Sequence, residues 1–261
     1  MGYFRLIYRL AGLAVIQLVL GLIALVATAI LSPFQRTRRA VIAFLQKLWG
    51  RLCCRVMNIR IQCEGTTGNS GGALLVSNHI GSVDIFVLAA CFHVSFVSKS
   101  DVRSWPVIGL LTRLAGTIFI DRARKTQVIG MVREISDRLR AGFHVAVFPE
   151  GGATPGNQVE HFKSSAFEAA VQAGSSVIPV MIRYYDDGEP SVACWPEGIT
   201  FMESMIRLLK HPRLNVLVWV FPAVTGEADR RIMADKSQAL ISKKFEETKA
   251  SPVGGSSVAV E

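Results

Sequence analysis

The chain has 261 residues, 50% of them hydrophobic, and carries 29 Lys and Arg against 20 Asp and Glu. This length suits one domain with a sizeable core, and 22 Gly, 10 Pro and 5 Cys exclude collagen-like, low-complexity and disulfide-framework proteins. Residues 1–60 hold nine basic residues and no acidic one, so the net charge of +9 belongs to this segment, which argues against a nucleic-acid partner for the folded domain.

The first predicted element is an uncharged stretch over residues 10–32, in which Gln17 is the single strongly polar side chain. A helix of this length measures about 34 Å and can cross a hydrocarbon core of about 30 Å. A secretory signal is the alternative, because Ala27-Thr28-Ala29 resembles a cleavage site, but the apolar core of a signal has about 7–15 residues. More Lys and Arg follow the stretch than precede it, which predicts a single-pass membrane anchor with the next domain in the cytoplasm.

The next predicted element is a basic amphipathic helix over residues 37–57. Its apolar side chains recur at steps of three and four residues, and Lys47, Arg51 and Arg55 lie on another face. Such a helix can lie in the head-group layer of a bilayer, although an ordinary surface helix packed on the domain has the same pattern. Because it follows a predicted span, we expect the interfacial position. Residues 1–57 are therefore the predicted membrane element, with the lipid bilayer as a partner.

Short apolar runs alternate with helical stretches in the rest of the chain. The predicted strands are residues 73–76, 94–97, 117–120, 145–148, 177–183 and 214–221, and the predicted helices are residues 83–92, 103–114, 126–140, 164–173, 201–209 and 229–249. Apolar strands separated by helices predict an α/β fold with a largely parallel central sheet flanked by helices. Pro179 predicts an edge strand or a bulge. We expect one domain over residues 58–250 and a flexible tail over residues 251–261.

The first polar cluster, residues 77–84, follows directly after a predicted strand and contains His79 and Asp84. A carboxylate can orient an imidazole and stabilise the imidazolium that forms when the ring takes a proton, so this pair is a candidate base with its orienting partner. Positions five apart on a regular helix differ by about 140°, so the side chains meet only if His79 lies in the loop and Asp84 in the first helical turn. A structural hydrogen bond is the alternative. Because no second His or carboxylate has metal-ligand spacing nearby, we expect no metal.

Two further clusters follow predicted strands, where open α/β sheets usually bind ligands. Arg122 ends the cluster over residues 116–122 and can bind a phosphate through two hydrogen bonds, or pair with its neighbour Asp121. Glu150 is followed by two glycines, which allow a ligand to approach the backbone, although a tight turn has the same requirement. Lys163 comes next, at a predicted helix start, where its charge and the helix dipole both favour an anion.

In order and spacing, these clusters resemble the motifs of the glycerolipid acyltransferase family. The His-x4-Asp motif of that family is similar to residues 78–84, its second block to residues 116–122, its Phe-Pro-Glu-Gly block to residues 148–151, and its Pro-containing fourth block to residues 177–180. The resemblance covers about residues 40–225. It implies that two residues are catalytic, His79 and Asp84. The residues that it implies for substrate binding are Asn78, Gly116, Arg122, Glu150, Gly151 and Lys163.

The resemblance implies transfer of a fatty acyl group from acyl-CoA or acyl-carrier protein to the free hydroxyl of a lysolipid, without a further cofactor. The acceptor expected first is 1-acyl-sn-glycerol-3-phosphate, which gives phosphatidate in phospholipid biosynthesis at a bacterial inner membrane. One departure keeps the acceptor open. Relatives that act on lysophosphatidate often continue the Phe-Pro-Glu-Gly block with Thr-Arg, whereas this chain has Gly152-Ala153-Thr154. Relatives that acylate other lysolipids, including lyso-ornithine lipid, also lack this Arg.

Two other classes of function stay open at this point. A lipid hydrolase would need a Ser nucleophile. Ser77 and Ser82 are the serines nearest to His79, and we expect no Gly-x-Ser-x-Gly elbow in this chain. A non-catalytic membrane scaffold would need only the anchor and the basic helix. Because a scaffold has no use for the His–Asp pair, we expect an O-acyltransferase.

Overall fold

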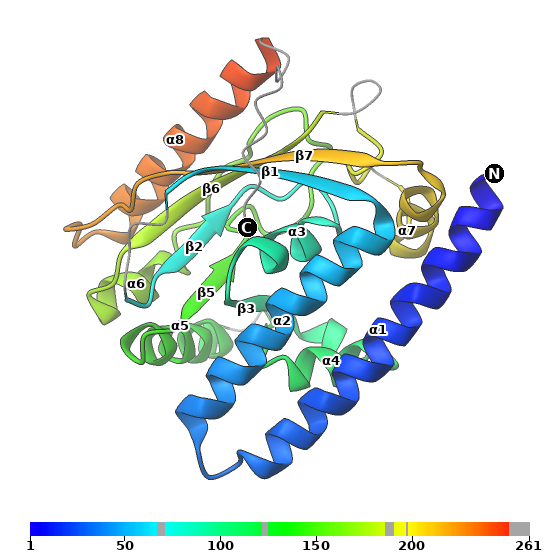
Figure 1. Ribbon diagram of the computed structural model, residues 1–261. Coiled ribbons are helices and arrows are strands. Elements are labelled where there is room, and N and C mark those ends of the chain that lie inside the picture. The colour runs from blue at the N-terminus through cyan, green and yellow to red at the C-terminus, as the bar shows by residue number, and fades with distance from the viewer. Residues whose placement is uncertain (67–70, 122–124, 186–190, 197, 251–261) are drawn as a thin grey trace.

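The computed structural model of the chain describes residues 1–66, 71–121, 125–185, 191–196 and 198–250 (Figure 1). The helices are α1 (Gly2–Ile30), α2 (Gln35–Met57), α3 (Asp84–Cys91), α4 (Ile108–Leu114), α5 (Lys125–Arg140), α6 (Phe167–Ala173), α7 (Phe201–Lys210) and α8 (Arg230–Ala250), with a 3-10 helix η1 (Ser100–Ser104). The strands are β1 (Ile59–Gly65), β2 (Leu74–Ser77), β3 (Val94–Lys99), β4 (Ile118–Ile120), β5 (His144–Val147), β6 (Val177–Tyr184) and β7 (Leu214–Val220).

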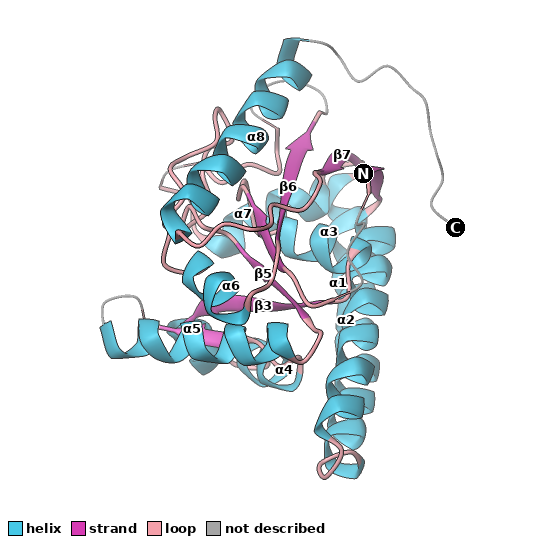
Figure 2. Cartoon of the chain, turned by 90° about the vertical axis from the view of Figure 1, so that its left-hand side faces the viewer, coloured by secondary structure: helices cyan, strands magenta, loops and turns pink. Residues whose placement is uncertain are grey.

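Within the described residues, seven strands form one sheet in the order β1-β7-β6-β2-β5-β3-β4. The five strands from β6 to β4 run parallel to their neighbours, while β7 is antiparallel to β6 and β1 is parallel to β7. Helices α5, α6 and α8 lie on one side of the sheet, and α1, α2 and α3 lie on the other (Figure 2). The predicted α/β fold with a largely parallel sheet and flanking helices is therefore confirmed.

The predicted strands do not include β1, and of the two positions predicted for Pro179, an edge strand or a bulge, the structure has the bulge. Strand β1 alternates apolar and polar residues, a pattern typical of a strand with one buried face. Strand β6 lies inside the sheet, between β7 and β2, so it is not an edge strand. On the β7 side, Val177 pairs with Val224 and Val180 with Val220, so the register shifts by one residue across Pro179. The predicted bulge is present, and it accommodates the missing N–H of the proline.

The predicted helix over residues 103–114 is divided in the structure. Helix η1 ends at Ser104, Trp105 is extended, and α4 begins only at Ile108. Pro106 causes the break, because it lacks an N–H and disfavours a helical conformation at the preceding residue. The other predicted helices in this domain agree with the structure to within three residues at their ends.

Helices α1 and α2 form an antiparallel hairpin that packs on the domain. The Trp49 indole of α2 donates a hydrogen bond to the Gln17 amide of α1 at 3.1 Å. Gly50 lets α2 approach α3, because a Cβ at this position would lie 2.5 Å from the Ala90 nitrogen. The predicted second helix is thus confirmed, and its buried face packs on α3 as in an ordinary surface helix.

Helix α1 begins at Gly2, eight residues before the predicted stretch, and so includes two arginines. The Arg9 guanidinium is 1% exposed and donates to the carbonyls of Leu209, His211 and Pro212 at 2.5–3.1 Å. Arg5 donates to the Lys210 carbonyl at 2.9 Å. Both side chains thereby satisfy carbonyls at the C-terminal end of α7, where helix carbonyls lack partners within the helix.

Candidate active site

The candidate site forms where β2 leads into α3. His79 lies in the loop between them and Asp84 is the first residue of α3, so the condition set by their five-residue spacing is met. The His79 Nδ1 and Asp84 Oδ2 atoms are 2.8 Å apart, and the Asp84 side chain is fully buried. Because Nδ1 donates to this carboxylate, Nε2 is the ring nitrogen that can accept a proton.

Three further donors fix the Asp84 carboxylate. The backbone N–H groups of Ile80 and Gly81 donate to Oδ2 at 2.7 and 3.0 Å. The Tyr184 hydroxyl, at the end of β6, donates to Oδ1 at 2.7 Å. Burial and the neighbouring carboxylate of Asp84 raise the pKa of Tyr184 well above its usual value, so its hydroxyl remains a donor. The carboxylate is therefore held from both the loop and the sheet, and it can fix the orientation of the imidazole.

The loop after β5 holds His79 from the other side. The Glu150 carboxylate accepts hydrogen bonds from the His79 N–H at 2.7 Å and the Glu160 N–H at 2.9 Å. The Thr154 N–H and hydroxyl donate to the His79 carbonyl at 2.9 and 3.1 Å. The His79 ring stacks on Phe148 with 4.0 Å between ring centroids. Both the backbone and the ring of His79 are thus held in one position.

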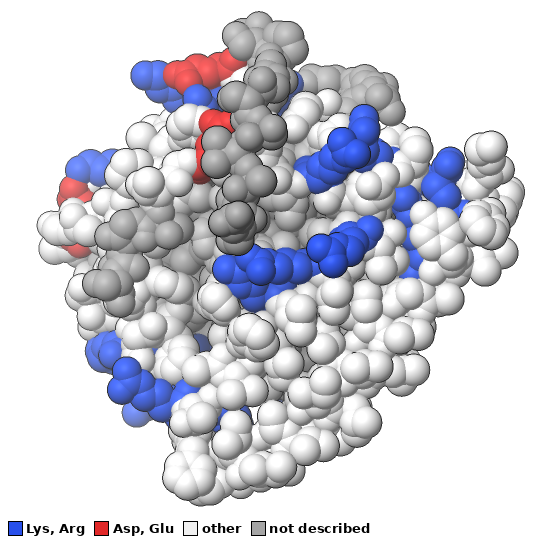
Figure 3. Space-filling view, in the orientation of Figure 1, with Lys and Arg blue, Asp and Glu red and all other residues white. Residues whose placement is uncertain are grey.

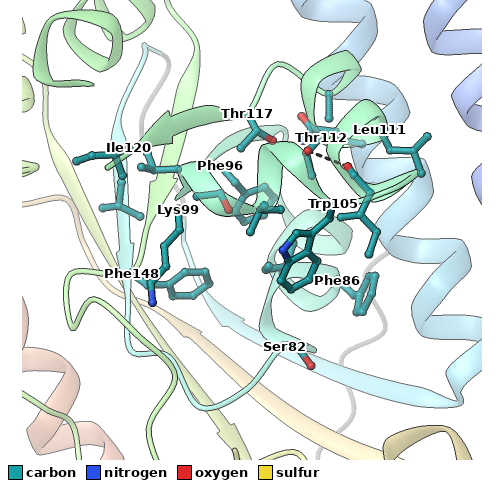
Figure 4. Close-up of a pocket in the computed structure, with 18 of the residues that line it drawn as sticks. Ser82, Phe86, Phe96, Lys99, Trp105, Leu111, Thr112, Thr117, Ile120 and Phe148 are labelled. Carbon is teal, nitrogen blue, oxygen red and sulfur yellow. Dashed lines mark hydrogen bonds between the residues drawn. The ribbon is translucent and has the colours of Figure 1, made fainter. Parts of the chain in front are cut away.

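His79 lines a cavity of about 1180 Å³ (Figure 4). This volume exceeds the range of about 300–1,000 Å³ that is usual for small-molecule sites, and the walls are mainly apolar. The cavity extends to the α1–α2 hairpin, where Gln17, Leu20 and Trp49 line it. It can therefore hold a long apolar chain beside the imidazole. Apolar residues that line it and are labelled in Figure 4 are Phe86, Phe96, Trp105, Leu111, Ile120 and Phe148.

Two lysines bring positive charge to the same cavity. Lys99 is the last residue of β3, and Lys163 lies in the loop before α6. Both side chains are exposed and both line the cavity that contains His79. Figure 4 shows the Lys99 side chain extending toward Phe148. An anionic group on a ligand can thus be attracted to the cavity that also contains the imidazole.

Comparisons with known proteins show which family the chain resembles. A family model described as Acyltransferase matches residues 58–183. The chain is 31% identical over 247 residues to lyso-ornithine lipid O-acyltransferase of Rhizobium meliloti (strain 1021), which covers 86% of this chain and 82% of the relative. It is 36% identical over 177 residues to 1-acyl-sn-glycerol-3-phosphate acyltransferase of Neisseria gonorrhoeae, which covers 65% of this chain and 68% of the relative.

The chain belongs to the glycerolipid acyltransferase family. It is an O-acyltransferase of the lysolipid acyltransferase group, and the resemblance seen in its motifs is confirmed. The crystal structure of the 1-acyl-sn-glycerophosphate (LPA) acyltransferase PlsC from Thermotoga maritima has the same fold. It matches with a TM-score of 0.75 over 98% of both chains, at 19% sequence identity.

The residues that the motifs implied for substrate binding have different positions in the structure of this acyltransferase. Gly151 and Lys163 line the cavity that contains His79. The Glu150 carboxylate is bonded to the backbone, as described above. The Asn78 amide is bonded at 2.9 Å to both the N–H and the carbonyl of Ile182, so it joins β2 to β6 and is not free for a substrate. Gly116 does not line this cavity but a second one, where its carbonyl accepts a hydrogen bond from Arg138 at 2.5 Å, and Arg122 lies outside the described residues.

Sequence reasoning missed two functional candidates of this acyltransferase, Tyr184 and Lys99. Tyr184 lies 100 positions from Asp84, and its signal was a hydroxyl at the end of a strand whose first six residues are apolar. Lys99 is a cation at the end of a strand, and the other polar clusters were singled out by the same position.

A Gly-x-Ser-x-Gly sequence does occur at residues 68–72, but it precedes strand β2. A nucleophilic serine of this kind follows a strand and precedes a helix.

Replacing Tyr184 by Phe is expected to lower kcat roughly tenfold while KM for both substrates stays within about twofold. The substitution removes one donor from a buried carboxylate, and a hydrogen bond to a charged group contributes about 1.5–3 kcal/mol. Steady-state kinetics of the purified enzyme would measure the change, with Tyr185→Phe as the matched control on the neighbouring residue. Because a purely structural role would lower stability alone, an unchanged kcat together with a lowered melting temperature would contradict a positioning role.

The pH dependence of stability is expected to report on Glu150. Burial raises the pKa of Glu150 to about 8, so between about pH 4.5 and 8 the folded state binds a proton that the unfolded state has released. The free energy of unfolding therefore decreases as pH rises through this window, by a few kcal/mol in all. Urea unfolding between pH 5 and 8.5 would measure the slope. Glu150→Gln should flatten the slope, whereas the control Glu246→Gln, on the exposed side of α8, should leave it unchanged. Parallel pH curves for the wild type and both variants would contradict a raised pKa of Glu150 as the cause of the slope.

Proposed function

We propose that the enzyme transfers an acyl group from an acyl thioester, acyl-CoA or acyl-carrier protein, to the free hydroxyl of a lysolipid with His79 as general base. The observation that supports this role is the Nδ1–Asp84 hydrogen bond, which leaves Nε2 as the proton acceptor. Nε2 takes the hydroxyl proton while the oxygen forms a bond to the thioester carbon. The carbon–sulfur bond then breaks, and the proton passes from the imidazolium to the departing thiolate. Asp84 orients the ring throughout.

We propose that Lys99 and Lys163 attract the anionic head of the acceptor. They line the cavity of His79, and charge-assisted contacts to phosphate or carboxylate are the strongest available to exposed side chains. Arg122, from the resemblance, is proposed for the same role. The first candidate acceptor is 1-acyl-sn-glycerol-3-phosphate. Lyso-ornithine lipid is the second, because Ala153 stands where an Arg is common in enzymes for lysophosphatidate and because the relative from Rhizobium meliloti carries that name.

We further propose that the enzyme contacts the bilayer through α1, which is long and apolar enough to cross a membrane. Figure 3 shows a broad surface without charged side chains over the lower length of α1, with basic side chains above it, and the start of α2 carries Arg36, Arg38 and Arg39. The sequence predicts a single-pass anchor with the domain in the cytoplasm. The bonds of Arg9 to the end of α7 favour another arrangement, in which α1 lies along the domain and only its outer face enters one leaflet.

A product assay with a panel of lysolipids would test the proposed reaction. Purified enzyme is incubated with labelled acyl-CoA or acyl-carrier protein and with lysophosphatidate, lyso-ornithine lipid or lysophosphatidylcholine, and products are identified by mass. Lys99→Gln and Lys163→Gln should raise KM for an anionic acceptor several-fold with little effect on KM for the donor. Release of free fatty acid without an acylated product would contradict transfer and favour hydrolysis.

The two membrane arrangements differ in where the N-terminus lies. An N-terminal epitope tag on the full-length protein would be tested with antibody and protease in intact and in lysed spheroplasts. If α1 lies along the domain, the tag is reached only after lysis, as is a tag placed at the C-terminus. A tag that is reached in intact cells would instead establish the single-pass topology.

A further inference from the structure

A second cavity, of about 270 Å³, lies at the start of β5 and is not lined by His79. The two cavities are lined by residues from opposite ends of strand β5, which shows how far apart they lie along this strand. Its first residue, His144, lines the second cavity, and Phe148, just beyond its last residue, lines the first. At about 3.3 Å per residue, these two positions are about 13 Å apart along the strand. The second cavity adjoins the first, because Ile42, Leu114 and Ala115 line both, but His79 does not line it and no step proposed above uses it.

Arginine side chains dominate the lining of this second cavity. Arg38 and Arg39 come from the start of α2, Arg113 from the end of α4, and Arg138 from the end of α5. One carboxylate, Glu134, also lines the cavity, and it is bonded to Arg138 at 2.7 Å. Among the described residues, the other three arginines have no acidic partner within ion-pair distance. The cavity therefore holds a positive charge that protein groups do not neutralise.

Buried donors around the cavity also lack partners. The Arg138 side chain is 7% exposed, and its Nη atoms donate to the Gly116 carbonyl and to Glu134. Its Nε is buried without a partner within the described structure, and so is the Thr28 hydroxyl of α1. His144 accepts the Ala73 N–H at Nδ1, so its Nε2 carries the ring proton. An unsatisfied buried donor is costly, and an anion with several oxygen atoms would satisfy these groups.

We propose that this second cavity binds a phosphate group, and that the headgroup of an anionic membrane phospholipid supplies it. Its size suits a phosphate and part of a glycerol headgroup, and arginine is the side chain best suited to phosphate oxygens. The membrane is the favoured source because two walls come from α1 and α2. At the same end of their hairpin, Ile30 and Phe34 are exposed. A bound headgroup would fix the hairpin, and with it the catalytic domain, against the lipid surface.

Calorimetric titration of the full-length enzyme in neutral detergent micelles would test this site. The probes are dihexanoyl phosphatidylglycerol, dihexanoyl phosphatidylcholine and inorganic phosphate. We expect saturable binding of the phosphatidylglycerol, at least tenfold tighter than that of the zwitterionic lipid. Arg39→Gln combined with Arg113→Gln should weaken this binding at least tenfold. Both side chains are partly or fully exposed, so the double variant should keep the melting temperature of the wild type.

Matched variants separate this site from general charge and from the catalytic cavity. Arg51→Gln with Arg55→Gln removes two charges from α2 outside the second cavity, and should weaken binding less than threefold. Equal loss in both double variants would overturn the proposal, because it would indicate unspecific attraction. Loss with Lys99→Gln and Lys163→Gln alone would also overturn it, because the lipid would then occupy the catalytic cavity. Inorganic phosphate that binds as tightly as the lipid would support the phosphate site and assign it to the free ion instead of a headgroup.

Discussion

Replacing His79 by Ala is expected to lower kcat/KM by at least a factor of about 10²–10⁴, the contribution usual for general acid–base catalysis. The variant loses the only group proposed to take the hydroxyl proton, while the cavity walls and the two lysines that line it stay in place. KM for the acceptor should therefore change less than kcat. Initial rates with a labelled acyl donor, over a wide range of enzyme concentration, would measure a loss of this size.

A matched control distinguishes loss of catalysis from loss of the fold. His161 is exposed and does not line the cavity, so His161→Ala should keep the wild-type rate. The far-ultraviolet circular dichroism and the melting temperature of His79→Ala should stay near those of the wild type, because the ring makes one side-chain hydrogen bond and one stacking contact. A rate within threefold of the wild type would refute the assignment of His79 as the base.

Replacing Asp84 by Asn is expected to have the second largest effect, a loss of about 10²–10³ in kcat. Asn keeps the size of the side chain, but an uncharged amide cannot stabilise the imidazolium that forms during proton transfer. In the wild type, the carboxylate accepts hydrogen bonds from four donors. The NH₂ group of Asn must face one of these donors, so the ring of His79 is held less firmly. The measurement is kcat at saturating acceptor, with Asp137→Asn on the exposed side of α5 as the control.

A double variant shows whether Asp84 acts through His79. If it does, Asp84→Asn adds little to the loss already caused by His79→Ala, because both changes remove the same function. Asp84 is fully buried, so its variant is expected to be less stable, and unfolding is measured separately for every protein. Effects of the two substitutions that multiply would show that the carboxylate contributes independently of the imidazole.

The sequence predicted the central part of this site because its constraints are local. His79 and Asp84 are five residues apart, and a loop followed by the first turn of a helix is the arrangement that lets them meet. The same is true of the parallel core of the sheet, where continuous apolar runs showed which strands are buried on both faces. These features depend on near neighbours and on hydrophobic pattern, which a single sequence contains.

The remaining features depend on contacts between distant segments. Tyr184 reaches Asp84 only because β6 lies beside β2 in the sheet, and nothing near residue 184 reveals that neighbour. The same pairing explains Asn78, which was expected to bind substrate but uses its amide to join these two strands. The missing N–H of Pro179 predicted an edge strand or a bulge, and the contacts with β7 decide between them, because a register shift against β7 lets Pro179 lie inside the sheet.

The packing of α1 has a practical consequence for anyone who wishes to produce the catalytic domain alone. Leu20, Gly21 and Ala24 of this helix line the catalytic cavity, and Arg9 satisfies the last carbonyls of α7. Phe201 and Met205, at the other end of α7, line the same cavity. Deletion of the first 34 residues is therefore not expected to give an intact catalytic domain. It would open the cavity beside His79 to water along one side and leave a helix end uncapped.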